Sequence, residues 1–199
     1  MNRSLPQQVW DLVGAPLRMT VLPIDTSRRL GFTSLEDERI GAVLPHIKGR
    51  LLDVGAGRNV LVKRYTGEGV GVDVNDFGMG CVIVKDSANL PFPDNAFDTA
   101  TFLACLNHIP NRADALREAK RILRPDGRLL VTMINPILGV IGHRFWWHGD
   151  DKRRPIIVGE REGLWNKDVI ALIEHAGFTL EKHERFVYGM NNLFIAKKA

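Results

Sequence analysis

The most informative part of this 199-residue chain is Leu51-Leu52-Asp53-Val54-Gly55-Ala56-Gly57-Arg58-Asn59. A short apolar run ends there in a turn, where Gly55 and Gly57 allow the backbone to approach a ligand closely. Asp73 follows about 20 residues later, at the end of the next apolar run, where a carboxylate can accept hydrogen bonds from both hydroxyls of a ribose. A glycine-rich turn alone is equally typical of an ordinary strand-to-helix connection. With Asp73, the pattern indicates a nucleoside-containing ligand.

Short β-rich runs and helical patterns alternate on both sides of this stretch, which is typical of a parallel sheet with crossover connections. The predicted strands are 50–54, 69–72, 82–85, 99–102, 128–133, 180–187 and 193–196. The last two are joined by the Gly- and Asn-rich residues 188–192 and form a hairpin. Thr33 to Glu36 is a capping-box pattern for a helix to about Ile47, and Asn111 and Asn166 are expected to cap two further helices. The prediction is an α/β fold with a mostly parallel seven-stranded sheet, a C-terminal antiparallel hairpin and helices on both faces.

Two connections depart from the regular alternation. Residues 73–81 are too few for a normal crossover helix, so we expect that helix to be much shortened, to one turn at most. Residues 135–164 form a long connection that contains Trp146 and Trp147. We expect it to cover the carboxyl edge of the sheet on the substrate side. The chain is thus predicted as one domain, 1–199, with an N-terminal helical segment (1–48), a ligand-binding core (49–134), this cover (135–164) and a closing helix and hairpin (165–199).

The composition excludes several classes of protein. Hydrophobic residues make up 45% and charged residues 25% of the chain, as in ordinary globular proteins, and the net charge is only +4. This mild basic excess does not favour a nucleic-acid partner. The two cysteines, Cys81 and Cys105, have no metal-site spacing, so we expect no metal, no disulfide and a reducing compartment. With no signal peptide or spanning helix in the pattern, the expected location is the cytoplasm.

The acid inside the turn narrows the choice of ligand. A dinucleotide site places a pyrophosphate on a helix N-terminus, where a neighbouring carboxylate would repel it. Asp53 precedes Gly55 by two positions and is better suited to a ligand that carries an ammonium and a sulfonium. Asp53 therefore argues against a nicotinamide dehydrogenase.

Several motifs in order resemble the Rossmann-like S-adenosylmethionine-dependent methyltransferases, especially their small-molecule, quinone and lipid branch. The segments that carry the resemblance are 52–57, 71–73, 86–92, 95–98, 106–109 and 118–127. One departure is Asn59 at the position of the motif's third glycine, where we expect its side chain to cap the next helix. The resemblance covers about Leu51 to Val131 closely and the rest of the chain to Ala199 more loosely.

The resemblance implies S-adenosyl-L-methionine as cofactor and a small-molecule or lipid-like methyl acceptor. In this reading Asp73 binds the ribose, Asp86 the exocyclic amine of adenine, and Ser87 the adenine ring through its backbone. The implied cofactor-binding residues are Asp53, Gly55, Ala56, Gly57, Asp73, Val74, Asp86, Ser87, Phe102 and Leu103.

The acceptor side is less defined, because methyl transfer needs a base only when the nucleophile must lose a proton. His108 and His148 are the candidates for that base, although a packing or capping role for His108 and a solvated-loop role for His148 are the simpler explanations. Cys105 lacks any neighbour that would activate a nucleophile. The alternatives are a non-catalytic module that binds the cofactor and an RNA or protein methyltransferase. A peripheral membrane contact and the oligomeric state stay open.

Overall fold

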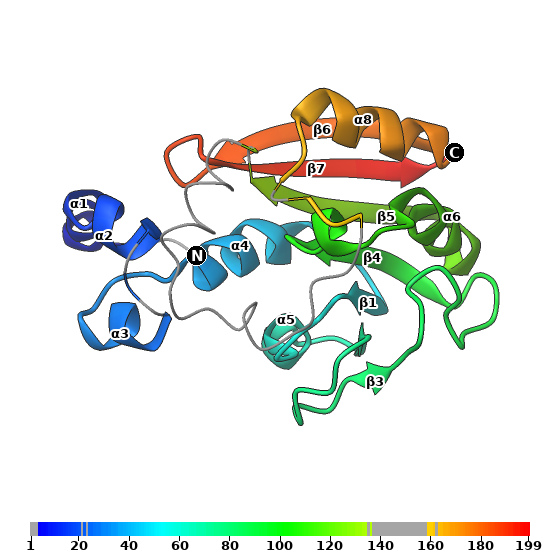
Figure 1. The fold of residues 1–199 in the computed structure, drawn as a ribbon, viewed down its shortest axis with the longest axis horizontal. Helices are drawn as coiled ribbons and strands as arrows, with labels where there is room; N and C mark the ends of the chain where they lie inside the picture. Colours follow the sequence, from blue (N-terminus) through cyan, green and yellow to red (C-terminus); the bar gives the residue numbers. More distant parts are fainter. Residues whose placement is uncertain (1–3, 21, 23, 135, 137–158, 162) are drawn as a thin grey trace.

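A computed structural model of the protein describes residues 4–20, 22, 24–134, 136, 159–161 and 163–199 (Figure 1). The strands are β1 (Leu51–Val54), β2 (Gly69–Asp73), β3 (Val82–Ile83), β4 (Phe97–Leu103), β5 (Leu123–Ile134), β6 (Phe178–Phe186) and β7 (Asn191–Lys198). The α-helices are α1 (Leu5–Val13), α2 (Ala15–Thr20), α3 (Ile24–Arg29), α4 (Leu35–Val43), α5 (Val60–Arg64), α6 (Arg112–Ile122) and α8 (Asn166–His175). Short 3-10 helices are η1 (Leu44–His46) and η2 (Leu106–His108).

In the described part of the chain, all seven strands form one sheet in the order β3-β2-β1-β4-β5-β7-β6. β1 to β5 are parallel, and β7 runs antiparallel to both β5 and β6. The strand order reverses between β1 and β4, which is where an open parallel sheet binds its ligand. The predicted α/β fold with a C-terminal antiparallel hairpin is therefore confirmed.

The link between β2 and β3 contains no helix, as its length predicted. β3 is consequently a strand of only two residues, shorter than the predicted 82–85. Both of its side chains are exposed. This end of the sheet therefore lacks the helix that a normal crossover would lay over it.

Helices cover both faces of the sheet, because successive side chains of a strand point to opposite faces. On one face, α6 and α8 pack on a core that includes Leu52, Phe102 and Val131. On the other face, α4 and α5 pack on a smaller core that includes Leu51 and Leu130. Each buried strand thus contributes alternate residues to two separate cores.

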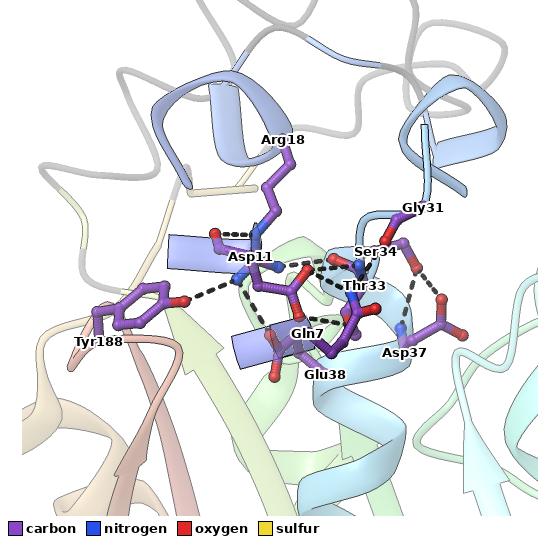
Figure 2. A network of polar contacts seen from close by, with 9 residues as sticks. All are labelled: Gln7, Asp11, Arg18, Gly31, Thr33, Ser34, Asp37, Glu38 and Tyr188. Carbon is purple, nitrogen blue, oxygen red and sulfur yellow. Dashed lines mark hydrogen bonds and ion pairs between the residues drawn. The ribbon is translucent and has the colours of Figure 1, made fainter. Parts of the chain in front are cut away.

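The helices α1, α2 and α3 lie beyond the end of the sheet, at the left of Figure 1. Figure 2 shows a network of polar side chains that connects α1 and α2 to α4 and to the loop before it. Asp11 of α1 is fully buried, and its carboxylate accepts hydrogen bonds from the backbone N–H and the hydroxyl of Thr33, at 2.8 and 2.7 Å. α1 is therefore tied by a polar contact to the loop that enters α4.

Arg18 of α2 is the centre of the same network (Figure 2) and is only 2% exposed. Its guanidinium donates to the carbonyls of Asp11 and Thr33, to the carboxylate of Glu38 on α4 at 3.1 Å, and to the hydroxyl of Tyr188 in the β6–β7 turn. One buried side chain thus connects the N-terminal helices, α4 and the C-terminal hairpin.

Several predicted helix starts were displaced by one residue. α4 begins after Ser34, whose hydroxyl accepts a hydrogen bond from the N–H of Asp37, so the predicted capping box at Thr33 and Glu36 is wrong. α4 also ends at Val43, before η1. Asn166 is the first residue of α8 rather than its cap. These differences are local and leave the order of elements unchanged.

Candidate functional site

The glycine loop after β1 has the backbone that its sequence indicated. Gly55 and Gly57 have φ of 70° and 50°, in the left-handed region that favours glycine. A Cβ at Gly55 would lie 2.6 Å from Cβ of Cys105, whereas a Cβ at Gly57 would meet no atom within 4 Å. Gly55 is therefore required by packing inside the protein, and Gly57 leaves open space beside the loop.

Asp73, at the end of β2, is held firmly by two backbone groups. Its Oδ2 accepts a hydrogen bond from the N–H of Gly57 at 2.8 Å, and its Oδ1 from the N–H of Asn75 at 2.9 Å. Each oxygen of a carboxylate can accept a second bond. The orientation of Asp73 is thus fixed while it keeps acceptor capacity for two ligand hydroxyls.

Asp53, in β1, is a buried acid beside the loop. It is 3% exposed, and its Oδ1 accepts a hydrogen bond from the hydroxyl of Thr101 at 2.6 Å. Burial raises the pKa of Asp53 to about 7; the hydrogen bond from Thr101 lowers it, and the carboxylate of Asp73 raises it. A cationic group in the site would offset that desolvation and favour the ionised form.

Asn59 does not cap α5, contrary to the prediction. No side-chain hydrogen bond caps this helix, and Asn59 has a left-handed backbone with φ of 58°. Its amide nitrogen instead donates to the carbonyls of Met79 and Gly80, at 3.5 and 3.3 Å. Asn59 therefore connects the glycine loop to the short link between β2 and β3.

Asp86, in the loop after β3, contacts Asn111, which directly precedes α6. The amide nitrogen of Asn111 lies 3.0 and 3.1 Å from the two carboxylate oxygens of Asp86 and donates to them. Asn111 was predicted to cap α6, but its side chain makes no capping bond. Its amide orients Asp86, the residue expected to recognise an exocyclic amine.

A cavity of about 570 Å³ joins these residues. Its size is within the usual range of small-molecule sites. Of the predicted cofactor-binding residues, those that line it are Asp53, Gly55, Ala56, Gly57, Asp73, Val74, Asp86, Ser87 and Leu103. Phe102 is different, because its side chain is fully buried in the core under α6 and α8.

α3 and α4 form a wall of the cavity that sequence reasoning missed. The residues are Ile24, Leu35, Glu36, Arg39 and Ile40. Periodicity shows that a helix has a buried face, but it does not show which edge of the sheet that helix approaches. The only available signal was the position of α4 directly before β1.

His108 lies in η2, just beyond β4, and also lines the cavity. Its Nδ1 is 3.2 Å from Oε2 of Glu160, and its Nε2 is 3.1 Å from the amide nitrogen of Asn107. Since an ionised carboxylate only accepts hydrogen bonds, Glu160 favours the tautomer with a proton on Nδ1 and a lone pair on Nε2.

Cys105 is a cavity residue with an unreactive thiol. Its Sγ donates to the carbonyl of Val54 at 3.0 Å. Burial raises the pKa of Cys105 well above its usual value, and the carboxylates of Asp53 and Asp73 add to that effect. The thiol therefore stays protonated, as expected for a residue that is not a nucleophile.

Part of the predicted acceptor side lies outside the described residues, namely His148, Trp146, Trp147 and most of 135–164. Within the described ranges, no group of three His, Cys, Asp or Glu side chains is placed to hold a metal ion. No helix in the same part of the chain is long and apolar enough to cross a membrane.

Comparison with known proteins is informative at this point. Residues 52–131, which contain the glycine loop, Asp73, Asp86 and His108, match the family model described as "Methyltransferase domain". Residues 52–131 thus resemble a methyltransferase domain, and the sheet around them has the Rossmann-like fold of S-adenosylmethionine-dependent methyltransferases. The cofactor of this family fits the residues present, because the cavity of the methyltransferase domain combines a buried acid for a cation with an oriented carboxylate for hydroxyls.

Two curated relatives are similar to this methyltransferase domain. The ubiquinone/menaquinone biosynthesis C-methyltransferase of Ectopseudomonas mendocina is 33% identical over 117 residues, 46% of this chain and 46% of the relative. The demethylmenaquinone methyltransferase of Paenarthrobacter aurescens is 33% identical over 94 residues, 41% of this chain and 37% of the relative. The chain thus spans less than half the length of these relatives.

Solved structures support the fold. An S-adenosylmethionine-dependent methyltransferase from Mesorhizobium loti has a TM-score of 0.61 at 20% identity, covering 81% of this chain and 97% of its own. The cyclase SpnF has a TM-score of 0.62 at 18% identity, covering 97% and 94%. Because one of these neighbours is a cyclase, the fold alone does not define the reaction.

Proposed function

We propose that the protein transfers the methyl group of S-adenosylmethionine to a small, ring-containing acceptor of the quinone or quinol type. The observation that carries the proposal is the single cavity that contains the glycine loop and its two acids and also reaches His108. Cofactor and acceptor groups can then lie side by side, which is the main requirement of an in-line transfer.

Three acidic residues of the chain each bind a different part of the cofactor. Asp53 attracts the ammonium group, Asp73 accepts hydrogen bonds from the ribose hydroxyls, and Asp86 accepts one from the adenine amine. The bound cofactor supplies an electrophilic methyl group on a positively charged sulfur. Gly57 leaves the space in which the ligand lies against the backbone.

His108 is the residue proposed to take a proton from the acceptor. An acceptor hydroxyl would compete with Asn107 for the lone pair on Nε2, and Glu160 would stabilise the resulting imidazolium through Nδ1. In balance, the acceptor gains a methyl group and loses one proton to His108, while the cofactor's sulfur becomes a neutral thioether. Glu160 acts only through His108, by orienting the ring and by stabilising its charged form.

Two observations support an apolar, ring-containing acceptor. Part of the cavity wall is aliphatic, with Leu35, Ile40 and Leu103. The two relatives described above are named for ubiquinone, menaquinone and demethylmenaquinone. A peripheral membrane contact stays a prediction, and the exposed apolar side chains of α1, such as Leu5 and Val13, are where it would be tested.

Calorimetry with S-adenosylmethionine and S-adenosylhomocysteine tests the cofactor half of the proposal. Asp73→Ala should weaken both by about tenfold or more, since a hydrogen bond to a charged acceptor contributes about 1.5–3 kcal/mol. A folded Asp73→Ala variant that binds like wild type would remove the ribose assignment.

Transfer of a labelled methyl group to a panel of quinols tests the acceptor half. We expect the wild-type protein to transfer the label to a quinol. The His108→Asn variant should lose this transfer while its affinity for the cofactor stays unchanged. Cofactor binding with no transfer to any acceptor would indicate the non-catalytic module. Label found only in RNA or protein would instead indicate a macromolecular substrate.

A further inference from the structure

Two buried side chains at the carboxyl end of β5 lack the hydrogen bonds that burial normally requires. Thr132 and Asn191 are both 0% exposed. The hydroxyl of Thr132 and both amide atoms of Asn191 have no hydrogen-bond partner in the part of the chain that the structure describes. Burying a polar atom without a partner destabilises the folded state, so native proteins keep few such atoms, and those kept call for an explanation.

The two side chains lie on the same face of the sheet. Asn191 pairs with Ile134, and Leu193 pairs with Thr132, in the antiparallel register of β5 and β7. Because side chains two positions apart share a face, Thr132 and Asn191 are diagonal neighbours. Leu193 belongs to the core under α4, so both polar side chains point toward α4.

This position is directly behind the cavity wall. Thr132 pairs with Leu103 in the parallel register of β4 and β5, and its carbonyl accepts a hydrogen bond from the N–H of Ala104. Leu103 and Ala104 line the cavity, as does Arg39 of α4. The unpartnered group is therefore one side chain away from the space assigned to the acceptor.

Other buried residues of the same types in the sheet are hydrogen-bonded. The hydroxyl of Thr99 donates to the carbonyl of Lys48 and accepts from its N–H, at 2.8 and 3.0 Å. The amide of Asn192 donates to the carbonyl of Met133, and its oxygen lies 2.9 Å from Nε2 of His183. The sheet therefore satisfies its polar side chains elsewhere, which makes Thr132 and Asn191 exceptions.

We infer that Thr132 and Asn191 form a polar subsite for a hydroxyl group of the acceptor, which enters when Leu103 turns aside. This inference rests on the proposed function. A hydroxyl can donate to the oxygen of Asn191 while it accepts from the amide or from Thr132, whereas a carbonyl can only accept. The subsite therefore selects a phenol or quinol over the oxidised quinone.

The test uses Thr132→Val and Asn191→Leu, which remove the polar atoms and keep the shape. Each variant should bind a short-chain demethylmenaquinol at least about tenfold more weakly, on protein saturated with S-adenosylhomocysteine and kept anaerobic, with cofactor affinity unchanged. Each should also raise the midpoint of thermal unfolding by about 2–4 °C, because an unpartnered buried group is removed. The matched controls Thr99→Val and Asn192→Leu should lower that midpoint.

The outcomes separate this inference from the proposed function. Wild-type protein that binds the quinol without methylating it contradicts the proposed reaction and leaves the subsite intact. Variants that bind the quinol like wild type, or that lose stability like the controls, overturn the subsite. If wild-type protein binds no quinol, the subsite and the proposed acceptor both fall.

Discussion

The N-terminal helices and the carboxyl edge of the sheet both bury polar side chains, but they treat them differently. Around Arg18, four acceptor groups converge on one guanidinium, and Asp11 is bonded to the backbone N–H and the hydroxyl of Thr33. At the edge of the sheet, Thr132 and Asn191 have no such partners among the described residues. Bonded polar groups hold two parts of a fold together, whereas unbonded ones weaken it and are retained where a ligand can bond them. Asp53 and Asn59 are intermediate cases, since each has only some of its polar atoms bonded.

The largest effect on stability is expected from breaking the hydrogen-bond network around Arg18. Arg18→Met removes the ion pair with Glu38 and leaves that carboxylate buried, which should cost about 3–5 kcal/mol. Hydrogen exchange should show that residues 5–32 lose protection first while β1, β4 and β5 keep theirs. Tyr188→Phe is the control, because it removes only one long hydrogen bond and should change stability by less than about 1 kcal/mol. Uniform loss of protection across the sheet would show that Arg18 supports the whole fold.

Because Asp53 is buried and only partly bonded, both the affinity for the cofactor product and the stability of the protein should depend on pH. Burial raises the pKa of Asp53 to about 7, so below pH 7 the ligand-free protein holds a proton that an ammonium ligand must displace. Affinity for S-adenosylhomocysteine should therefore rise about tenfold between pH 6 and pH 8. Without ligand, the folded state binds this proton more tightly than the unfolded chain, so the contribution of Asp53 to stability falls as pH rises from about 4 to 7. An Asp53→Asn variant whose affinity still rises tenfold would assign the titration to another group.

Substitution of Asn59 should have the smallest effect, a modest loss of cofactor affinity even though it introduces the residue of the family motif. Asn59→Gly restores the glycine that the family motif has here and suits the left-handed backbone. It also removes the bonds to Met79 and Gly80, which hold the link next to Asp73. We expect cofactor affinity to fall about two- to fivefold, since these two bonds, at 3.5 and 3.3 Å, are long and therefore weak. Tighter binding by Asn59→Gly in calorimetry would contradict this role.

The sequence predicted the features that depend on local properties of the chain, but not those that depend on contacts between distant segments. The glycine loop lies directly after β1 and Asp73 at the end of β2, as predicted, because backbone freedom and strand ends are local properties of the chain. Asn59 and Asn111 were both expected to cap helices, and both instead bond to distant residues. An asparagine amide suits many partners, and tertiary contacts decide among them. The wall formed by α4 and the unpartnered pair at Thr132 and Asn191 depend on packing between distant segments, for which a single sequence carries no local signal.

The two edge strands of the sheet, β3 and β6, differ in how well they could pair with a strand of another molecule. β3 offers only two residues, too few to recruit another strand. β6, at the opposite edge, is nine residues long and would be a better template. It carries Glu181, Lys182, Glu184 and Arg185, and its register shifts between Leu180 and Lys182. Charges and an irregular register discourage edge-to-edge aggregation, so one edge is protected by its brevity and the other by its side chains.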